Sequence, residues 1–291
     1  MPISLADASE LFRQAPDSFI DVGHGEVAYR KVGTGPDVVF SHGWPVSGAT
    51  FRCLLPHLVD HVTCHIIDYV SAGSSRFTAD SDVSIQGHID ALRTTIDHLG
   101  LDSVGVVGHD SGGLIARHAV AGDERLRGLG LINTEPATGV SWRFKMFLAN
   151  RRIPGFGSAL GWLAGKPGIR RNKFVLGDAF TDRSLLDGEF DEFFLRPLHE
   201  DRARQTTAVR LLKSFDYRFI SELPEVHSRI DAPVRLVWGV DDPFFTIENA
   251  RADVATFANA SLVEVEGAGL FSHEEDGAAV AAGLLPVLVG D

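Results

Sequence analysis

The sequence predicts an α/β fold, with a mostly parallel, doubly wound sheet and one helical insertion. Short apolar, β-branched runs, which are typical of strands buried on both faces, alternate with helical patterns in both terminal parts of the chain. Between them, residues 135–230 mix glycine, proline, arginine and large aromatic residues without a clear strand. A loop of that length is implausible in a compact domain. The 291 residues, 44% of them hydrophobic, suit one large domain with an insertion.

Residues 1–134 are predicted to form the first part of the sheet domain. The clearest helix is 85–99, whose apolar residues recur on one face and which Gly100 ends. A turn rich in glycine and proline at 33–36 closes a hairpin. In chain order, we expect a helix at 4–14, strands at 26–31 and 37–41, a helix at 51–58, a strand at 62–68, the helix at 85–99, a strand at 104–107, a helix at 114–120 and a strand at 126–133.

The helical insertion, 135–230, is expected to form a cap, and residues 231–291 complete the sheet domain. Candidate cap helices lie at 142–151, 156–164 and 203–215. After the insertion, strand and helix patterns alternate again, as a doubly wound fold requires. The expected elements are a strand at 234–238, a helix at 246–257, a strand at 262–265 and a helix at 274–289.

The composition excludes several classes of partner. A net charge of −12 argues against nucleic acid and anionic membrane surfaces, because both favour clustered Lys and Arg. The N-terminal residues lack the basic head and apolar run of a secretion signal, and no stretch approaches the length of a membrane span. With only Cys53 and Cys64, no disulfide framework is implied. We expect a cytoplasmic protein without cofactor or metal that takes a small hydrophobic molecule, and a homodimer is left open.

The most informative stretch is a strand, a sharp turn and a helix around Asp110. A turn this tight places its central residue in a sparsely populated backbone region, so small residues are needed two positions before and after it. Gly108 and Gly112 occupy these positions around Asp110. The alternative register, with Ser111 at the centre, would put His109 where a small residue is required. A phosphate or dinucleotide loop is disfavoured, since neither fingerprint is present.

Residues 108–113, G-H-D-S-G-G, resemble the nucleophile elbow of the Asp-nucleophile branch of α/β-hydrolases, which contains epoxide hydrolases, haloalkane dehalogenases and fluoroacetate dehalogenases. The resemblance covers residues 25–289. It implies the α/β-hydrolase fold, with a helical cap over the substrate cavity and Asp110 as the nucleophile.

Two further loops resemble that family. Residues 42–45, H-G-W-P, are similar to its oxyanion loop, which implies that the backbone N–H groups of Trp44 and Ser111 form the oxyanion hole. Residues 238–243, W-G-V-D-D-P, are similar to the loop that carries the acid of the triad. The matching position is Asp242, with Asp241 as the fallback. Some relatives place the acid after the preceding strand, where Glu135 is the alternative and Asn133 occupies the closest position.

The expected base is displaced from the family position. Relatives carry a histidine in a glycine-containing loop after the last strand, but Leu270 stands at that position here. His273 lies three residues later, about one helical turn, and is expected to act as the base. If His273 is instead a capping or surface histidine, the protein would stall at a covalent intermediate or bind a ligand without turnover.

The resemblance implies attack by Asp110 on an electrophilic sp³ carbon, followed by hydrolysis of the resulting ester. Epoxide opening also needs a proton donor, and Tyr217 is the one tyrosine of the predicted cap. Trp162 or Trp142 would supply a second donor, while Phe193 and Phe194 are further candidates for the cavity wall. We therefore expect an epoxide hydrolase for a bulky hydrophobic epoxide. A haloalkane dehalogenase and a non-catalytic ligand-binding relative remain the alternatives.

Overall fold

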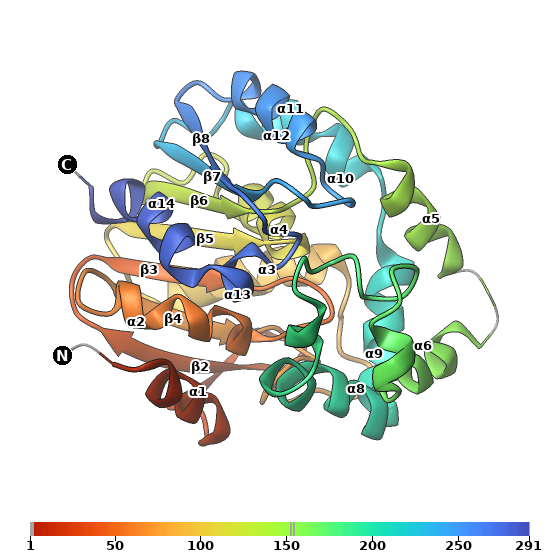
Figure 1. Cartoon of the computed structure of the whole chain (residues 1–291). Helices are drawn as coiled ribbons and strands as arrows, with labels where there is room; N and C mark the ends of the chain where they lie inside the picture. The colour runs from red at the N-terminus through yellow and green to blue at the C-terminus, as the bar shows by residue number, and fades with distance from the viewer. Residues whose placement is uncertain (1–2, 152, 154, 291) are drawn as a thin grey trace.

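The computed structural model describes residues 3–151, 153 and 155–290 and shows an eight-stranded sheet between two layers of helices (Figure 1). The outermost residues of the predicted sheet domain, 1–2 and 291, lie outside the described residues. The strand order is β1-β2-β4-β3-β5-β6-β7-β8. The strands are β1 Ser18–Asp21, β2 Glu26–Gly33, β3 Asp37–Ser41, β4 Thr63–Asp68, β5 Val104–His109, β6 Leu126–Ile132, β7 Val234–Gly239 and β8 Ala260–Val265.

The sheet is parallel from β4 to β8, and the hairpin β1–β2 extends it in the antiparallel sense. Every residue of the central strand β5 is buried, which explains its continuous apolar pattern. Strand order reverses between β3 and β5, because β4 follows β3 on one side and β5 pairs with β3 on the other. In doubly wound sheets, ligands bind beyond the carboxyl ends of the strands at such a reversal.

Helices cover both faces of the sheet (Figure 1). Helix α14 contacts β6 and β7 and, with α2, α1 and α13, covers one face, whereas α3 and α4 pack together on the other. The sheet-domain helices are α1 Leu5–Arg13, η1 Gly48–Cys53, α2 Leu55–Leu58, α3 Ile85–Leu99, α4 Ser111–Val120, α12 Ile247–Asp253, η4 Val254–Thr256, α13 Ser272–Glu275 and α14 Gly277–Val289.

The segment between β6 and β7 is built from helices and turns in the part of 135–230 that the structure describes. Helices α6, α8 and α9 contact one another beyond the edge of the sheet layers (Figure 1), while α11 packs back on α4. The helices are α5 Trp142–Asn150, α6 Phe156–Ala164, α7 Pro167–Arg170, η2 Arg183–Leu186, the π-helical turn η3 Asp191–Leu195, α8 Arg196–Glu200, α9 Arg202–Ser214, α10 Arg218–Ser221 and α11 Leu223–His227.

The predicted α/β class is confirmed, with local differences. Strand β1 was not predicted, because its four residues are too few for a clear alternation. The helix expected at 51–58 is divided into the 3-10 helix η1 and the short α2, with Pro56 in the first turn of α2. Proline cannot donate the backbone hydrogen bond that a continuous helix needs. In the described part of the chain, no helix combines the length and apolar character required to cross a bilayer.

Candidate active site

The turn between β5 and α4 presents Asp110. Its backbone has a φ of 52° and a ψ of −137°, and it caps the N-terminus of α4. A Cβ on Gly108 would lie 2.5 Å from the Cα of Gly113, and one on Gly112 would overlap the carbonyl oxygen of Ser41. Gly108 therefore allows α4 to start close to β5, and Gly112 allows it to approach the end of β3. The strained residue at the centre of the turn is Asp110 rather than Ser111.

Backbone N–H groups converge on the Asp110 carboxylate. The N–H of Trp44 donates to Asp110 Oδ2 at 2.8 Å, and the N–H of Ser111 also stabilises the ionised carboxylate. The loop that carries Trp44 is held in place at two points. His42 Nε2 accepts the backbone N–H of Tyr69 at 2.9 Å, and Trp44 Nε1 donates to the carbonyl of Ala208 in α9 at 3.0 Å. The structure thus brings both predicted oxyanion donors to Asp110.

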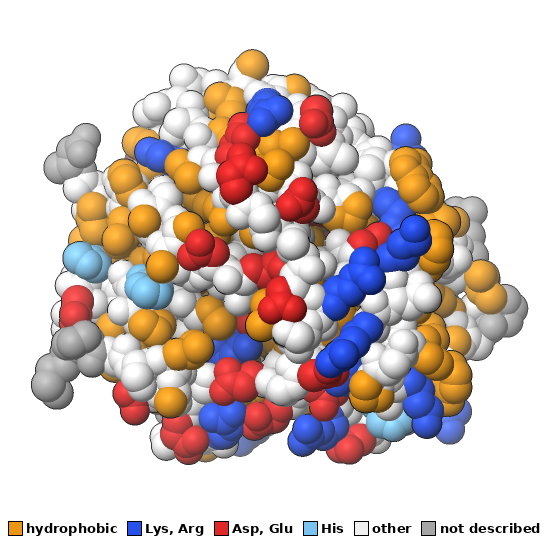
Figure 2. All heavy atoms as spheres, in the orientation of Figure 1, with side chains coloured by type: hydrophobic (Ala, Val, Ile, Leu, Met, Phe, Trp, Pro, Cys, Tyr) orange, Lys and Arg blue, Asp and Glu red, His pale blue; other side chains and the backbone are white. Residues whose placement is uncertain are grey.

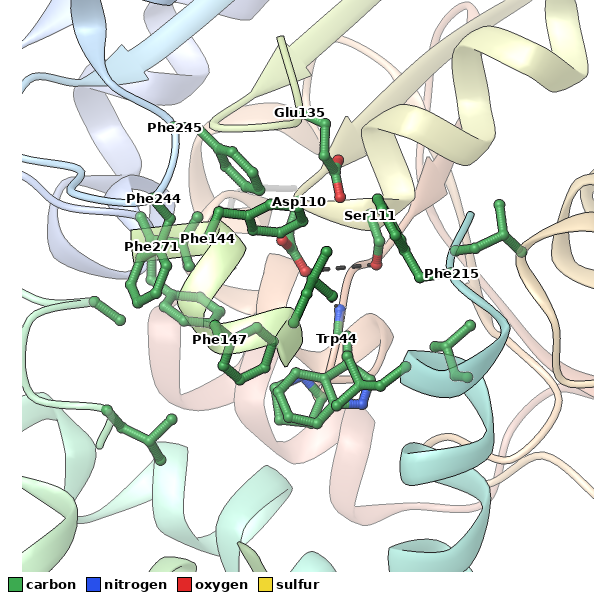
Figure 3. A pocket seen from close by; sticks show the side chains of 18 of the residues that line it. Trp44, Asp110, Ser111, Glu135, Phe144, Phe147, Phe215, Phe244, Phe245 and Phe271 are labelled. Atoms are coloured by element: carbon green, nitrogen blue, oxygen red, sulfur yellow. Dashed lines mark hydrogen bonds between the residues drawn. The ribbon is translucent and has the colours of Figure 1, made fainter. Parts of the chain in front are cut away.

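A cavity opens above Asp110 (Figure 3), with about 740 Å³ of empty space when its mouth to solvent is included. Its wall is mostly aromatic and aliphatic, and Asp110 and Glu135 are the titratable side chains among the described lining residues. The described residues that line it are Trp44, Pro45, Ile85, Asp110, Ser111, Glu135, Phe144, Phe147, Leu148, Val175, Leu176, Ala179, Leu211, Leu212, Phe215, Phe244, Phe245, Leu270 and Phe271.

The two carboxyl groups influence each other's ionisation. Burial raises the pKa of Asp110 well above its usual value, and the nearby charge of Glu135 raises it further, while the N–H groups of Trp44 and Ser111 act in the opposite direction. Burial also raises the pKa of Glu135, against an opposing effect of Arg117. In such a pair, the second charge is disfavoured once the first has formed.

Asp242 lies behind the cavity wall in a closed hydrogen-bond network. Its Oδ1 accepts the N–H groups of Phe244 at 2.7 Å and Phe245 at 3.1 Å, and its Oδ2 accepts Nδ2 of Asn133 at 2.9 Å. Burial raises the pKa of Asp242 to about 7, although these donors oppose the shift. Leu270 lines the cavity at the family's histidine position, so Asp242 has an amide rather than an imidazole as its side-chain partner.

The structure does not bring His273 to the cavity. This histidine is fully buried, and its Nε2 lies 2.7 Å from Thr50 Oγ1 in η1. The centroid of its ring lies 4.3 Å from the ring centroid of His109 and 5.8 Å from that of Phe51. The reason is local, since Leu270 and Phe271 take the inward positions of the loop. The short α13 then turns His273 towards η1. The geometry therefore does not support the expected role of His273 as the base.

Comparison with known proteins identifies the family. The sequence model of the alpha/beta hydrolase fold matches residues 36–277. The chain belongs to the α/β-hydrolase superfamily. Haloalkane dehalogenase 2 of Mycobacterium tuberculosis is 28% identical over 280 residues, which cover 92% of this chain and 93% of the relative. Dehalogenases are therefore among the relatives of this α/β-hydrolase.

Solved structures show the same fold. An α/β-hydrolase fold protein from Burkholderia ambifaria superposes with a TM-score of 0.76 at 24% identity, covering 92% of this chain and 97% of the other. The epoxide hydrolase CorEH superposes with a TM-score of 0.74 at 18% identity, covering 91% and 95%. These similarities establish the architecture of this α/β-hydrolase and leave its reaction to the site.

Three aromatic residues expected at the substrate lie outside this cavity. Trp142, Trp162 and Tyr217 have exposed fractions of 67%, 52% and 43%. Exposed hydrophobic side chains gather over the inserted helices at the right of Figure 2. Phe193 and Phe194 line a neighbouring cavity of about 520 Å³ on the other side of Trp44 instead. The donors expected from tyrosine and tryptophan are thus absent from the described wall above Asp110.

Phenylalanines form much of the wall in this α/β-hydrolase, and most were not predicted. In α5, Phe144, Phe147 and Leu148 lie on the inner face, while Trp142 at the start of the helix points outward. Their spacing of three and four residues is the helical signal that identifies such a face. Phe215, Phe244, Phe245 and Phe271 come from loops, where no periodicity indicates direction.

Proposed function

We propose that this α/β-hydrolase opens a neutral, hydrophobic epoxide through a covalent ester on Asp110. The observation that carries the proposal is a carboxylate at a strained turn, held by the Trp44 N–H at the base of an apolar cavity. An apolar wall favours an uncharged substrate, because a charged one would lose its hydration without a partner. Asp110 Oδ1 attacks an epoxide carbon, and Oδ2 remains as the carbonyl oxygen of the ester.

The oxyanion donors serve the second half of the reaction. Water attacks the ester carbonyl of Asp110, and negative charge develops on Oδ2. The N–H groups of Trp44 and Ser111 stabilise that charge. Removing one such donor typically raises the barrier by about 3 kcal/mol.

A haloalkane is the second candidate substrate, because haloalkane dehalogenase 2 matches this chain over nearly its whole length. A leaving halide is stabilised by N–H donors in the cavity. Here the indole N–H of Trp44 donates to the carbonyl of Ala208. The remaining described wall is mostly carbon, with Ser111 and Glu135 as its other polar side chains beside Asp110. The wall therefore favours an epoxide.

The ester is tested by intact-protein mass after rapid mixing with styrene oxide, an uncharged aryl epoxide. The wild type is expected to show a transient mass increase equal to one substrate, mapped to Asp110 by peptide analysis. A single turnover in H₂¹⁸O is expected to place the heavy oxygen in the Asp110 carboxylate, because water attacks the carbonyl carbon.

The matched control is Asp110→Asn, which keeps the shape of the side chain and removes the nucleophile. We expect no adduct and no diol from this variant, since a neutral amide is a poor nucleophile. A wild type that binds styrene oxide without adduct or diol would instead identify a ligand-binding relative. Bromide released from benzyl bromide faster than diol forms from styrene oxide would favour the dehalogenase.

A further inference from the structure

The proposed hydrolysis of the Asp110 ester needs a base, and in the family that base is a histidine. No histidine is among the described residues that line it. Glu135 is 1% exposed, and Figure 3 shows its carboxyl group pointing towards Asp110 and Ser111. It enters the cavity from the loop after β6, the strand that pairs with β5.

The hydroxyl of Thr134 lies between Asp110 and Glu135. Thr134 Oγ1 lies 2.7 Å from the main-chain carbonyl of Asp110 and 3.1 Å from Glu135 Oε2, and it receives an N–H from Arg117 at 3.1 Å. A hydroxyl has a single proton to donate. A carbonyl only accepts, so the short bond to Asp110 takes that proton. The same proton is left only partly for Glu135 Oε2, at the longer distance of 3.1 Å, so Thr134 gives an ionised Glu135 little hydrogen-bond stabilisation.

The positive charge of Arg117 is divided among several acceptors and is not directed at the Glu135 carboxyl. The nearest guanidinium, that of Arg117, directs Nη2 to the main-chain carbonyl of Glu135 at 2.7 Å. Its Nη1 lies 3.8 Å from Asp253 Oδ2. Arg117 thus has another carboxylate to neutralise. Asp110 instead receives the N–H groups of Trp44 and Ser111 at the start of a helix, which stabilise an anion. One negative charge shared between the two carboxyls therefore favours Asp110.

We propose that Asp110 and Glu135 form a one-proton carboxyl pair in which Glu135 replaces histidine, first as the acid and then as the base of epoxide hydrolysis. This inference rests on the proposed function and adds the residue that moves the proton. In the first step, Asp110 Oδ1 forms a bond to the epoxide carbon as the C–O bond breaks. The leaving alkoxide takes the proton of Glu135, which becomes a carboxylate.

The second step restores the charges and protons of the pair, while Asp110 Oδ1 leaves with the diol and the water oxygen takes its place. Glu135 takes a proton from water, and the hydroxide adds to the ester carbonyl of Asp110. The tetrahedral intermediate collapses, the alkoxide leaves with the proton from Glu135, and the diol is free. Asp110 is left protonated and Glu135 ionised, and transfer of that proton restores the starting pair. Epoxide and water are consumed, and no net proton is taken up or released.

This cycle is matched to epoxides more than to halides. A halide leaves without a proton, so Glu135 would still be protonated when the ester forms and would be unable to activate water. It would first have to lose its proton to solvent from a buried position. The pair therefore assigns a substrate class, a neutral strained ether that needs protonation to open.

The test uses Glu135→Gln, because the amide has the shape of the neutral acid and should preserve the fold but cannot act as an acid or a base. With styrene oxide, alkylation of Asp110 is expected to slow by at least about 100-fold, the usual effect of losing a general acid. Benzyl bromide needs no proton to react, so Asp110 of the variant should be alkylated at a rate similar to that of the wild type. The benzyl ester should persist in the variant, and in the wild type it should decay only as Glu135 loses its proton to solvent. Both rates are read by intact mass and corrected with Asp110→Asn.

The outcomes separate this inference from the proposed function. If Glu135→Gln converts styrene oxide at the wild-type rate and still forms the adduct on Asp110, the role of Glu135 is overturned and the ester mechanism stands. If the ester accumulates in His273→Gln while Glu135→Gln turns over normally, His273 rather than Glu135 is the base. No adduct in the wild type with either reagent would overturn the proposed function itself. Glu135→Asp, which keeps an acid, is expected to recover part of the turnover, and thermal unfolding checks that each variant is folded.

Discussion

At the scale of single residues, Leu270 decides the character of the site. Its side chain lines the cavity, while its carbonyl oxygen lies 3.0 Å from Nε2 of the buried His109. Asp242 lies nearby with its carboxylate held by Asn133 and two backbone N–H groups. The predicted orienting acid, Asp242, thus lacks an imidazole that it could orient.

Restoring the imidazole should restore a base. We expect Leu270→His, made in Glu135→Gln, to speed hydrolysis of the benzyl ester on Asp110 by about 100-fold. The measurement is the decay of the ester mass after excess benzyl bromide is removed. The gain should vanish when Asp242→Asn is added, because the imidazolium then loses its partner. An unchanged ester lifetime would show that position 270 does not reach the ester.

Local geometry explains which site residues could be predicted from the sequence. Asp110 follows from residues that are its neighbours in the chain, since the glycines around it define the turn. The two predicted oxyanion donors follow from the resemblance of residues 42–45 and 108–113 to the loops of the family. His273 could not be placed in this way, because its direction depends on which loop residues fill the cavity first. For Glu135, the sequence predicts only the alternative role of the acid that orients the base. Its hydrogen bond to Thr134, which motivates another role, exists only in the folded protein.

At the scale of elements, the contact between α4 and β3 sets the geometry of the elbow. Helix α4 begins directly after Asp110, and its second residue, Gly112, meets the last residues of β3 and the loop that follows. Ser41 Oγ also donates to the carbonyl of Gly112 at 2.7 Å, which ties the two elements together.

This contact predicts that alanine substitution changes the free energy of unfolding in opposite directions at two glycines. Gly112→Ala is expected to lower the free energy of unfolding by about 1–3 kcal/mol, because the added methyl group overlaps backbone that cannot move aside. Gly168→Ala in α7 is the matched control, since open space surrounds its Cβ position. There the better helix propensity of alanine should stabilise by up to about 1 kcal/mol. Denaturant unfolding measures both, and equal effects would contradict the proposed close packing.

Elements were predicted best where periodicity is long. Helix α3 has the expected bounds of 85–99, and the sheet strands after β1 lie close to their predicted positions. The helical phase of α5 was harder to assign, because an exposed Trp142 precedes the phenylalanines that face the cavity. Large aromatic residues favour burial on average, so composition alone indicated the wrong residue.

At the scale of the whole molecule, burial raises the pKa of several interior carboxyl groups. Besides the pair in the cavity, burial raises the pKa of Asp242, Asp253 and Glu274. Such groups remain protonated in the folded state at pH values where the unfolded chain has released its protons. Their contribution to stability is present at low pH and is lost as the pH rises towards the folded pKa.

Asp242 allows this linkage to be measured. Its pKa is about 7 in the folded protein and close to 3.8 when unfolded, so the folded state holds one extra proton between these values. The stability of the wild type relative to Asp242→Asn should be larger at pH 5 than at pH 8 by roughly 2 kcal/mol. Denaturant unfolding at both pH values gives this difference. The exposed Asp241→Asn controls for the loss of one negative charge, and a pH-independent difference for Asp242→Asn would refute the linkage.

The architecture as a whole was the most predictable property, because the alternation of strands and helices determines a doubly wound sheet. How the inserted helices lie over the sheet could not be predicted. Their positions depend on contacts between segments far apart in the sequence, such as the bond from the Trp44 indole to Ala208 in α9.

That bond has a practical consequence for spectroscopy. The four tryptophans fall into three environments, with Trp142 and Trp162 in water, Trp238 wholly enclosed, and Trp44 between two cavities with its indole bonded to α9. A collisional quencher such as iodide removes the emission of the two outer indoles and leaves the inner ones. The residual fluorescence then comes from Trp238 and Trp44. Because only Trp44 of these two borders the cavities, a change in this fluorescence on ligand addition reports that a cavity has been filled.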